Sequence, residues 1–243
     1  MPRSKEARVA LVTGCSRGIG LAIVRRMQAE GFRVAGFATS EESARRSGAE
    51  LPLACDVADA AEVDAGITRV LGELGRLDVV VNNAGVAGAN PLDAGSDDGL
   101  WYRILDVSLS GTYLVSKRAL PHLPAETGRV INIASVLGLR GVPDQTAYCA
   151  AKHGVVGFTK ALALYLAPRR IPVNAICPGW VRTDMAEQRA RELGCSQEAL
   201  AAEIPLGRMV EPDEVAELAL YLTSEAASSM TGQTLTIDGG SLA

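Results

Sequence analysis

The chain has 243 residues, of which 48% are hydrophobic and 21% charged, and its formal net charge is −4. A chain of this length and hydrophobicity can bury one large core, so we expect a single domain spanning residues 1–243. The slight acidic excess, without a basic block or tail, argues against nucleic acid and anionic membranes as partners.

The N-terminal stretch Met1–Arg8 is polar and basic, and the apolar run after it is too short for a signal-peptide core or a membrane span. The cysteines are odd in number and scattered, with no metal-ligand spacing: Cys15, Cys55, Cys149, Cys177 and Cys195. We therefore expect reduced thiols, no metal site and a cytoplasmic protein.

Seven short apolar runs rich in Val and Ile predict strands at Val9–Thr13, Arg33–Phe37, Leu51–Cys55, Leu77–Asn82, Arg129–Ala134, Ile171–Cys177 and Thr234–Ile237. Stretches with helical spacing separate them, which indicates an α/β fold with a doubly wound parallel sheet covered by helices on both faces. The least regular regions, Gly85–Gly99 and Trp180–Gly207, follow strands. We expect them to form the walls of a site and a mobile lid at about 182–207.

The first strand leads into a glycine-rich turn, Thr13–Gly20, at which a helix begins. Gly14 permits the tight turn, Gly18 lets the backbone approach a pyrophosphate, and Gly20 allows the helix to pack closely on the strand. The free amides at the start of that helix favour a diphosphate. The turn also contains Ser16, Arg17 and Ile19, which we include in the predicted cofactor site.

Two further strand ends carry polar or small residues at the same sheet edge. The third strand is followed by Asp56-Val57, and the aspartate can accept a hydrogen bond from the exocyclic amine of an adenine. After the fourth strand come Asn83, Ala84 and Gly85, where small side chains leave space for a ribose. We expect the preceding Asn82 to tie strands together inside the sheet.

Three side chains suit proton transfer to or from a carbonyl or alcohol. Tyr148 and Lys152 are four residues apart in a helical stretch, so they project from one face about 6 Å apart at Cβ. A nearby ammonium favours the phenolate and is expected to lower the tyrosine pKa. Ser135 closes the fifth strand at the same edge, where its hydroxyl can donate to a substrate oxygen.

The motifs TGxxxGIG, NNAG and YxxxK together resemble the single-domain branch of the short-chain dehydrogenase/reductase family over essentially the whole chain. The resemblance implies a Rossmann-type seven-stranded sheet of order 3-2-1-4-5-6-7 and a homotetramer or homodimer. It also implies that Ser135 orients the substrate, Tyr148 exchanges the proton, and Lys152 lowers the tyrosine pKa and holds the nicotinamide ribose. The segment Pro178–Thr183 would hold the carboxamide through Val181 and Thr183, beside Pro178 and Gly179.

One position departs from the family pattern. Ser108 stands where most relatives carry a catalytic asparagine, which in that family kinks its helix and offers its main-chain carbonyl to a water of a proton relay. A serine keeps the carbonyl but has a shorter side chain to brace the kink. We therefore predict retained but slowed turnover and include Ser108 among the catalytic residues.

The end of the second strand favours NADP over NAD. An acid at this place would hydrogen-bond the ribose hydroxyls of NAD and repel a 2′-phosphate, but the chain has Thr39 and Ser40 there. These hydroxyls and the cation Arg17 suit a phosphate. Glu41 and Glu42 keep NAD open as the alternative, although they are better placed to cap the next helix.

The resemblance implies an NADPH-dependent carbonyl reductase, reversible as an alcohol dehydrogenase, and the chain is most similar to 3-oxoacyl-acyl-carrier-protein reductases. A β-ketoacyl thioester is the first substrate to consider. Carrier-protein users of the family dock the carrier on two basic residues; Arg169 matches one, but Glu126 stands at the other. A smaller ketone or a coenzyme A ester, an NAD-dependent secondary alcohol dehydrogenase and a low-turnover dinucleotide sensor remain the alternatives.

Overall fold

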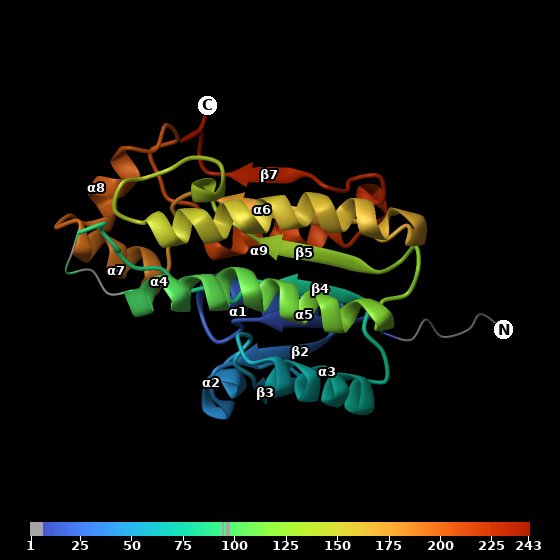
Figure 1. Cartoon of the computed structure of the whole chain (residues 1–243). Coiled ribbons are helices and arrows are strands. Elements are labelled where there is room, and N and C mark those ends of the chain that lie inside the picture. The colour runs from blue at the N-terminus through green and yellow to red at the C-terminus, as the bar shows by residue number, and fades with distance from the viewer. Residues whose placement is uncertain (1–6, 94, 96–97) are drawn as a thin grey trace.

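The computed structural model describes residues 7–93, 95 and 98–243, and its centre is one parallel sheet in the order β3-β2-β1-β4-β5-β6-β7 (Figure 1). The order and direction of the strands confirm the predicted Rossmann-type sheet. All strand boundaries lie within two residues of the predicted ones. The strands are β1 (Val9–Thr13), β2 (Arg33–Ala38), β3 (Leu51–Ala54), β4 (Val79–Asn82), β5 (Arg129–Ile133), β6 (Val173–Pro178) and β7 (Thr234–Ile237).

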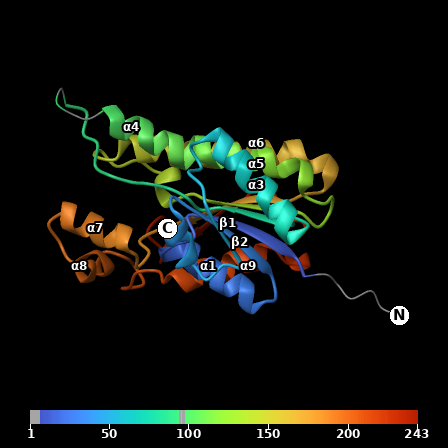
Figure 2. The same cartoon turned by 90° about the horizontal axis from the view of Figure 1, so that it is seen from below.

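Helices cover both faces of the sheet, as Figure 2 shows. One face carries α3 (Ala60–Leu74), α5 (Gly111–Ala119) and α6 (Thr146–Leu166), and the other carries α1 (Gly18–Ala29) and α9 (Pro212–Leu222). Because side chains alternate along a strand, β1 sends Val9 and Leu11 into one core and Ala10 and Val12 into the other. Most strand residues are therefore apolar on both faces of the sheet, and polar residues do not alternate with them.

The register of the sheet gathers the ends of the central strands at one edge. Asn82 of β4 lies opposite Asn132 of β5, and Ile133 of β5 lies opposite Ile176 of β6. Inside the sheet, the Asn82 amide donates to Asn132 Oδ1 at 2.8 Å and to Ser116 Oγ at 2.9 Å, as expected for a residue that ties strands together. The segments after β1, β4, β5 and β6 consequently emerge side by side.

The segment after β6 forms α7 (Asp184–Glu192) and α8 (Gln197–Ala202), which project beyond this edge within the predicted lid region (Figure 1). The segment after β4 leads into α4 (Asp98–Leu105). Residues 94, 96 and 97 of the predicted wall Gly85–Gly99 lie outside the described residues. A short helix, α2 (Glu41–Arg45), follows β2.

Within the described ranges, no helix is long and apolar enough to cross a membrane, and no cluster of His, Cys, Asp and Glu could hold a metal ion.

Candidate active site

The glycine turn after β1 has the geometry of a diphosphate cradle. α1 begins without a side-chain cap and without an acidic residue in its first turn, so its first amides stay free for an anion. A Cβ at Gly20 would lie 2.2 Å from Gly14 O, and one at Gly14 would lie 2.9 Å from Ala84 Cα. Only glycine fits these two positions, and Gly14 also has a φ of +64°. The turn therefore fits a dinucleotide.

Asn83 and Thr13 hold this turn in place. The Asn83 amide donates to Thr13 O at 2.9 Å and to Gly14 O at 3.0 Å, and the main-chain amides of Asn83 and Ala84 each donate to Thr13 Oγ1 at 3.0 Å. The side chain predicted to contact the cofactor is thus used to join the β1 and β4 turns. Ala84 and Gly85 follow with half-buried surfaces.

At the end of β2, Thr39 and Ser40 are exposed, and Ser40 Oγ caps α2 by accepting from Ser43 N at 3.2 Å. Glu41 forms an ion pair with Arg45, and Glu42 pairs with Arg46 at 3.3 Å. Both glutamates therefore pair with arginines one turn further along α2, on the exposed side of that helix. In the glycine turn, Arg17 is exposed, and its contact with Asp184 is long at 3.8 Å.

Asp56 after β3 is held from two sides. Its Oδ1 accepts from Ala58 N at 3.0 Å, and its Oδ2 accepts from Arg103 Nη1 of α4, also at 3.0 Å. Val57 packs so closely on the start of α5 that a Cβ at Gly111 would lie 2.6 Å from it. The predicted adenine-binding segment is therefore anchored to the helix that follows the β4 loop.

Ser135, Tyr148 and Lys152 come together at the end of β5. Ser135 begins the 3₁₀ turn Val136–Gly138, where its Oγ accepts from Leu137 N at 3.1 Å, and its hydroxyl also hydrogen-bonds Tyr148. Lys152 Nζ donates to Ile133 O at 2.7 Å and lies 5.6 Å from the centre of the Tyr148 ring. Tyr148 is half-buried, whereas Lys152 is only 4% exposed.

Close packing of the Ser135 turn on α6 creates this arrangement. A Cβ at Gly138 would lie 2.7 Å from the Lys152 carbonyl oxygen, so the turn can reach the helix only with glycine at this position. One helical turn separates Tyr148 from Lys152, as their spacing predicted. The three groups thus belong to two segments in direct backbone contact.

The pKa of Tyr148 shifts in the direction opposite to the expected one. Burial raises the pKa of Tyr148 to about 12, although its hydrogen bond with Ser135 acts in the opposite direction. Burial also lowers the pKa of Lys152 to about 8. The expected lowering of the tyrosine pKa by the ammonium is wrong for the protein alone, because the low-dielectric surroundings penalise both charges.

Ser108 occupies a π-helical turn, Asp106–Ser110, between α4 and α5, so the helix is interrupted at the position where the family has asparagine. Ser108 Oγ accepts from Val86 N at 3.3 Å and donates to Val86 O at 3.4 Å, which are long contacts. The Ser108 carbonyl accepts from Thr112 Oγ1 at 3.0 Å. A Cβ at Gly85 would lie 3.4 Å from Ser108 Oγ and 3.6 Å from Lys152 Nζ, so Ser108 and Lys152 flank the same glycine.

The remaining predicted cofactor residues follow β6. Pro178 is its last residue, and a Cβ at the adjacent Gly179 would lie 2.8 Å from the Asp238 Cβ. Val181 forms an isolated bridge with Val210. Thr183 caps α7 by accepting from Ala186 N at 3.4 Å, and its methyl group would lie 3.1 Å from a Cβ at Gly18. The loop after β6 therefore touches the glycine turn.

Three residues near the site belong to none of the motifs: Asn90, Arg103 and Gly138. Asn90 caps the start of α6, Arg103 holds Asp56, and Gly138 admits the Ser135 turn. The partners of Asn90 and Arg103 are 57 and 47 residues away in the chain. No local spacing signals such contacts.

The fold and the site together define an oxidoreductase of the Rossmann type. A dinucleotide cradle and a serine, tyrosine and lysine lie at the same carboxyl edge of the sheet. The model of a family described as enoyl-(acyl carrier protein) reductase matches residues 14–241.

Relatives match over nearly the whole chain. A putative ketoacyl reductase of Streptomyces coelicolor is 41% identical, with 98% of each chain covered. A 3-oxoacyl-[acyl-carrier-protein] reductase, FabG, of Haemophilus influenzae is 38% identical, covering 97% of this chain and 98% of the relative. A solved structure of an actinorhodin polyketide ketoreductase variant with NADPH matches with a TM-score of 0.91 and 40% identity, covering 98% of each chain. The chain belongs to the short-chain dehydrogenase/reductase family.

Proposed function

We propose that the protein is an NADPH-dependent reductase of ketones that also oxidises the corresponding alcohols. The observation that carries the proposal is the meeting of Ser135, Tyr148 and Lys152 next to Gly85 and the glycine turn. The likeness to a ketoreductase structure with NADPH supports both the reaction and the cofactor.

Bound NADPH would supply the hydride, and the side chains of the protein supply the proton and the orientation. Tyr148 donates its hydroxyl proton to the carbonyl oxygen as that oxygen gains negative charge. Ser135 donates a hydrogen bond to the same oxygen and fixes the ketone. The ammonium form of Lys152 stabilises the resulting phenolate of Tyr148 until a proton returns from solvent.

The cofactor site lies at the same edge of the sheet and is formed by the glycine turn and the segments after β2, β3 and β6. The free amides of α1 and the cradle of Gly14, Gly18 and Gly20 would receive the diphosphate, flanked by Ser16 and Ile19. Arg17, Thr39 and Ser40 are exposed and would receive the 2′-phosphate. Asp56 and Val57 would hold the adenine. Val181 and Thr183, beside Pro178 and Gly179, would hold the carboxamide.

A 3-oxoacyl thioester is the substrate class that the relatives favour. The candidate carrier-docking residues are committed to internal contacts. Arg169 donates to Leu120 O at 2.7 Å and also to Leu123 O, and Glu126 forms an ion pair with Arg170. Arg169 keeps its positive charge, because its partners are neutral carbonyl oxygens, but Glu126 and Arg170 cancel each other. One of the two docking positions therefore offers an acidic carrier no net positive charge, which favours a small thioester or a free ketone.

The test is cofactor consumption against a panel of β-ketothioesters, small ketones and cyclic diketones, with each reduced nicotinamide cofactor. We expect turnover with NADPH that disappears in Tyr148→Phe, and a higher rate with a small thioester than with the same acyl group on carrier protein. Tight NADPH binding without turnover on any member of the panel would instead favour the sensor alternative.

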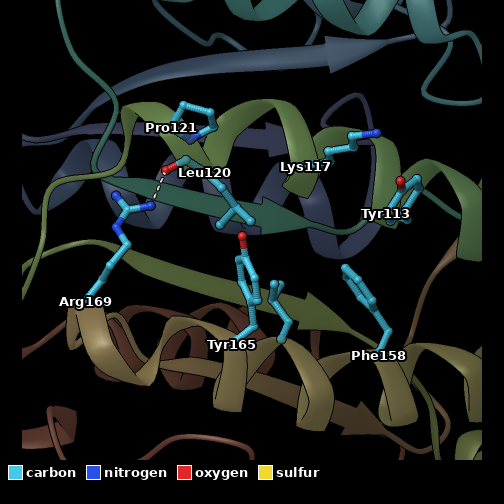
Figure 3. A pocket seen from close by; sticks show the side chains of 8 residues that line it. Tyr113, Lys117, Leu120, Pro121, Phe158, Tyr165 and Arg169 are labelled. Carbon is cyan, nitrogen blue, oxygen red and sulfur yellow. Dashed lines mark hydrogen bonds between the residues drawn. The ribbon is translucent and has the colours of Figure 1, made fainter.

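We further propose that two or four copies of this chain assemble through α5 and α6. A groove of about 630 Å³ runs between these helices (Figure 3), lined by Tyr113, Lys117, Leu120, Pro121, Phe158, Leu162, Tyr165 and Arg169. Leu164 is 79% exposed and Tyr165 is 74% exposed on the same helix. Such exposed apolar side chains on two neighbouring helices suit packing against the same pair in a second copy.

We also propose a cytoplasmic location. All five cysteines are free, and four of them are buried, which suits a reducing compartment.

A further inference from the structure

The catalytic helix α6 does not cap its own N-terminus. Gln145 occupies the N-cap position, but its side chain makes no capping hydrogen bond. The first-turn amide of Ala147, which has no acceptor within the helix, donates to Asn90 Oδ1 at 3.0 Å. Thr146 Oγ1 donates to the same oxygen at 3.2 Å. Asn90 is 6% exposed, so this cap is shielded from water. It comes from the loop after β4, more than 50 residues earlier in the chain.

The backbone of Asn90 holds the same segment. Its amide donates to Asp144 O at 2.8 Å, and Asn90 pairs with Gln145 in an isolated parallel bridge. Residues 144–147 are thus bound to one residue through both main chain and side chain. Tyr148 is the next residue, and its position along α6 depends on where this first turn lies.

The loop that carries Asn90 begins at the residues that flank Lys152. Gly85 lies against Lys152 Nζ, and Val86 exchanges hydrogen bonds with Ser108. Asn90 follows four residues after Val86. The β4 loop therefore contacts the catalytic groups at one end and the start of their helix at the other.

We propose that Asn90 is a positioning residue for Tyr148, an inference that rests on the proton-transfer role of Tyr148 in the proposed function. Its oxygen completes the first turn of α6 and fixes where the phenol stands relative to Ser135. Its neutrality also matters. A carboxylate would cap the helix equally well, but its negative charge beside the tyrosine would disfavour the phenolate.

The charged groups near the clamped segment are few. Asp144 forms an ion pair with Arg189 of α7, and Arg189 also pairs with Glu192 at 3.1 Å. Of the two lysines on α6, Lys152 is the one beside Tyr148, and Lys160 lies two turns further along the helix. The thiols of Cys149 and Cys177 lie near Tyr148. Asp144 and Arg189 compensate each other, so a new carboxylate at position 90 would add an uncompensated negative charge against Ala147, the residue before Tyr148.

The experiment compares Asn90→Ala and Asn90→Asp with a matched control, Asn174→Ala, in the full-length enzyme. Asn174 is another buried asparagine that links backbones, because it donates to Met230 O at 2.6 Å and accepts from Gln233 N at 3.1 Å. It stands near the start of β6, at the opposite edge of the sheet. The readouts are thermal stability, the Kd for NADPH, kcat for ketone reduction, and the pH dependence of alcohol oxidation.

We expect Asn90→Ala to lower kcat by about ten- to a hundredfold, because a small misplacement of a catalytic group costs that much, while the Kd for NADPH changes less than about threefold. Asn90→Asp keeps the acceptor and should recover most of kcat at high pH. Its acidic limb for oxidation should move upward by about half a pH unit, because the added charge raises the pKa of Tyr148. Asn174→Ala should lose thermal stability but keep kcat and the pH profile.

The inference is overturned if Asn90→Ala keeps the wild-type kcat and pH profile, or if Asn174→Ala reproduces its losses. It is also overturned if the acidic limb of the pH profile for alcohol oxidation lies at the same pH in Asn90→Asp as in the wild type. Should Asn90→Ala not fold, Asn90→Asp and Asn90→Ser, which both retain an acceptor, give the same readouts. Tyr148→Phe separates the two levels: if that variant keeps full activity, the proposed function fails, whereas an inactive Tyr148→Phe with a normal Asn90→Ala removes only the role of Asn90.

Discussion

Lys152 Nζ donates to the main-chain oxygen of Ile133 at 2.7 Å, so the lysine of the YxxxK motif is fastened to the end of β5, two residues before Ser135. Lys152 is 4% exposed, and no acidic side chain is among the groups that shift its pKa. The protonated, charged form of Lys152 is therefore destabilised in the folded protein without cofactor.

The contribution of Lys152 to the stability of the protein without cofactor should rise with pH above about 8. Burial lowers the pKa of Lys152 from 10.5 to about 8, so between these values the unfolded chain holds the extra proton. The contribution of the lysine to the free energy of unfolding then increases with pH, by about 3 kcal/mol over the whole window. The buried thiols of Cys15, Cys55 and Cys177 act oppositely above their ordinary pKa of 9.0, and Tyr148 does so above 10, so the lysine is isolated by comparison with a variant that lacks it. The measurement is urea unfolding of the wild type and Lys152→Met at pH 7.5 and 9.5, on either side of the lysine pKa. The unfolding free energy should change with pH by different amounts in the two proteins, and an equal change in both would contradict the prediction.

Gly138→Ala should impair catalysis as well as stability. The new Cβ would lie 2.7 Å from Lys152 O and 2.9 Å from its carbonyl carbon, so the Ser135 turn and α6 must move apart. We expect a loss of about 1–3 kcal/mol in the free energy of unfolding and at least about a tenfold lower kcat. Gly141→Ala is the control, because its Cβ would meet nothing within 4 Å. Equal activity of both variants would show that the close packing is unimportant.

Arg17→Ala should lower kcat/KM for NADPH by about tenfold and leave kcat/KM for NADH within about twofold, since only the former carries a 2′-phosphate. Arg17 is exposed, and its 3.8 Å contact with Asp184 contributes little stability. Arg25→Ala removes another exposed arginine, within α1, and serves as control. A parallel loss with both cofactors would assign Arg17 to the diphosphate instead.

Ser108→Asn should raise kcat by about two- to fivefold. The serine makes only the long contacts with Val86 at 3.3 and 3.4 Å, and an asparagine amide has the reach and the donors to shorten them. The measurement is kcat as a function of pH in both directions of the reaction. If neither the rate nor the pH dependence changes, the side chain at this position is immaterial.

The pair of substitutions Leu164→Glu and Tyr165→Glu should dissociate the assembly into single chains. Both side chains are largely exposed on α6, and two carboxylates would lose their hydration if they were buried between two copies. Light scattering coupled to size-exclusion chromatography measures the mass. Leu92→Glu, which changes a leucine that is 80% exposed in the β4 loop, should leave the mass unchanged. A wild-type protein that elutes as a single chain would exclude the proposed interface.

Local sequence determined the elements of this protein and most of its motifs. Each strand is an apolar run bounded by turn residues, and burial on both faces of a parallel sheet requires such runs. The turn Thr13–Gly20 could be identified because glycine alone tolerates the approach of Gly14 O to position 20. The spacing of Tyr148 and Lys152 predicted a shared helix face because the helical repeat is fixed.

Tertiary structure alone decided which distant groups support the site and which way their pKa values shift. Asn90 caps a helix whose amide lies 57 residues further on, and Arg103 reaches back 47 residues to Asp56. No local periodicity specifies such pairs. The pKa of Tyr148 likewise depends on burial, which a spacing of four residues does not contain. Neighbouring residues along the chain set local conformation, whereas solvent exclusion and long-range contacts arise only when the sheet edge, the Ser135 turn and α6 are packed together.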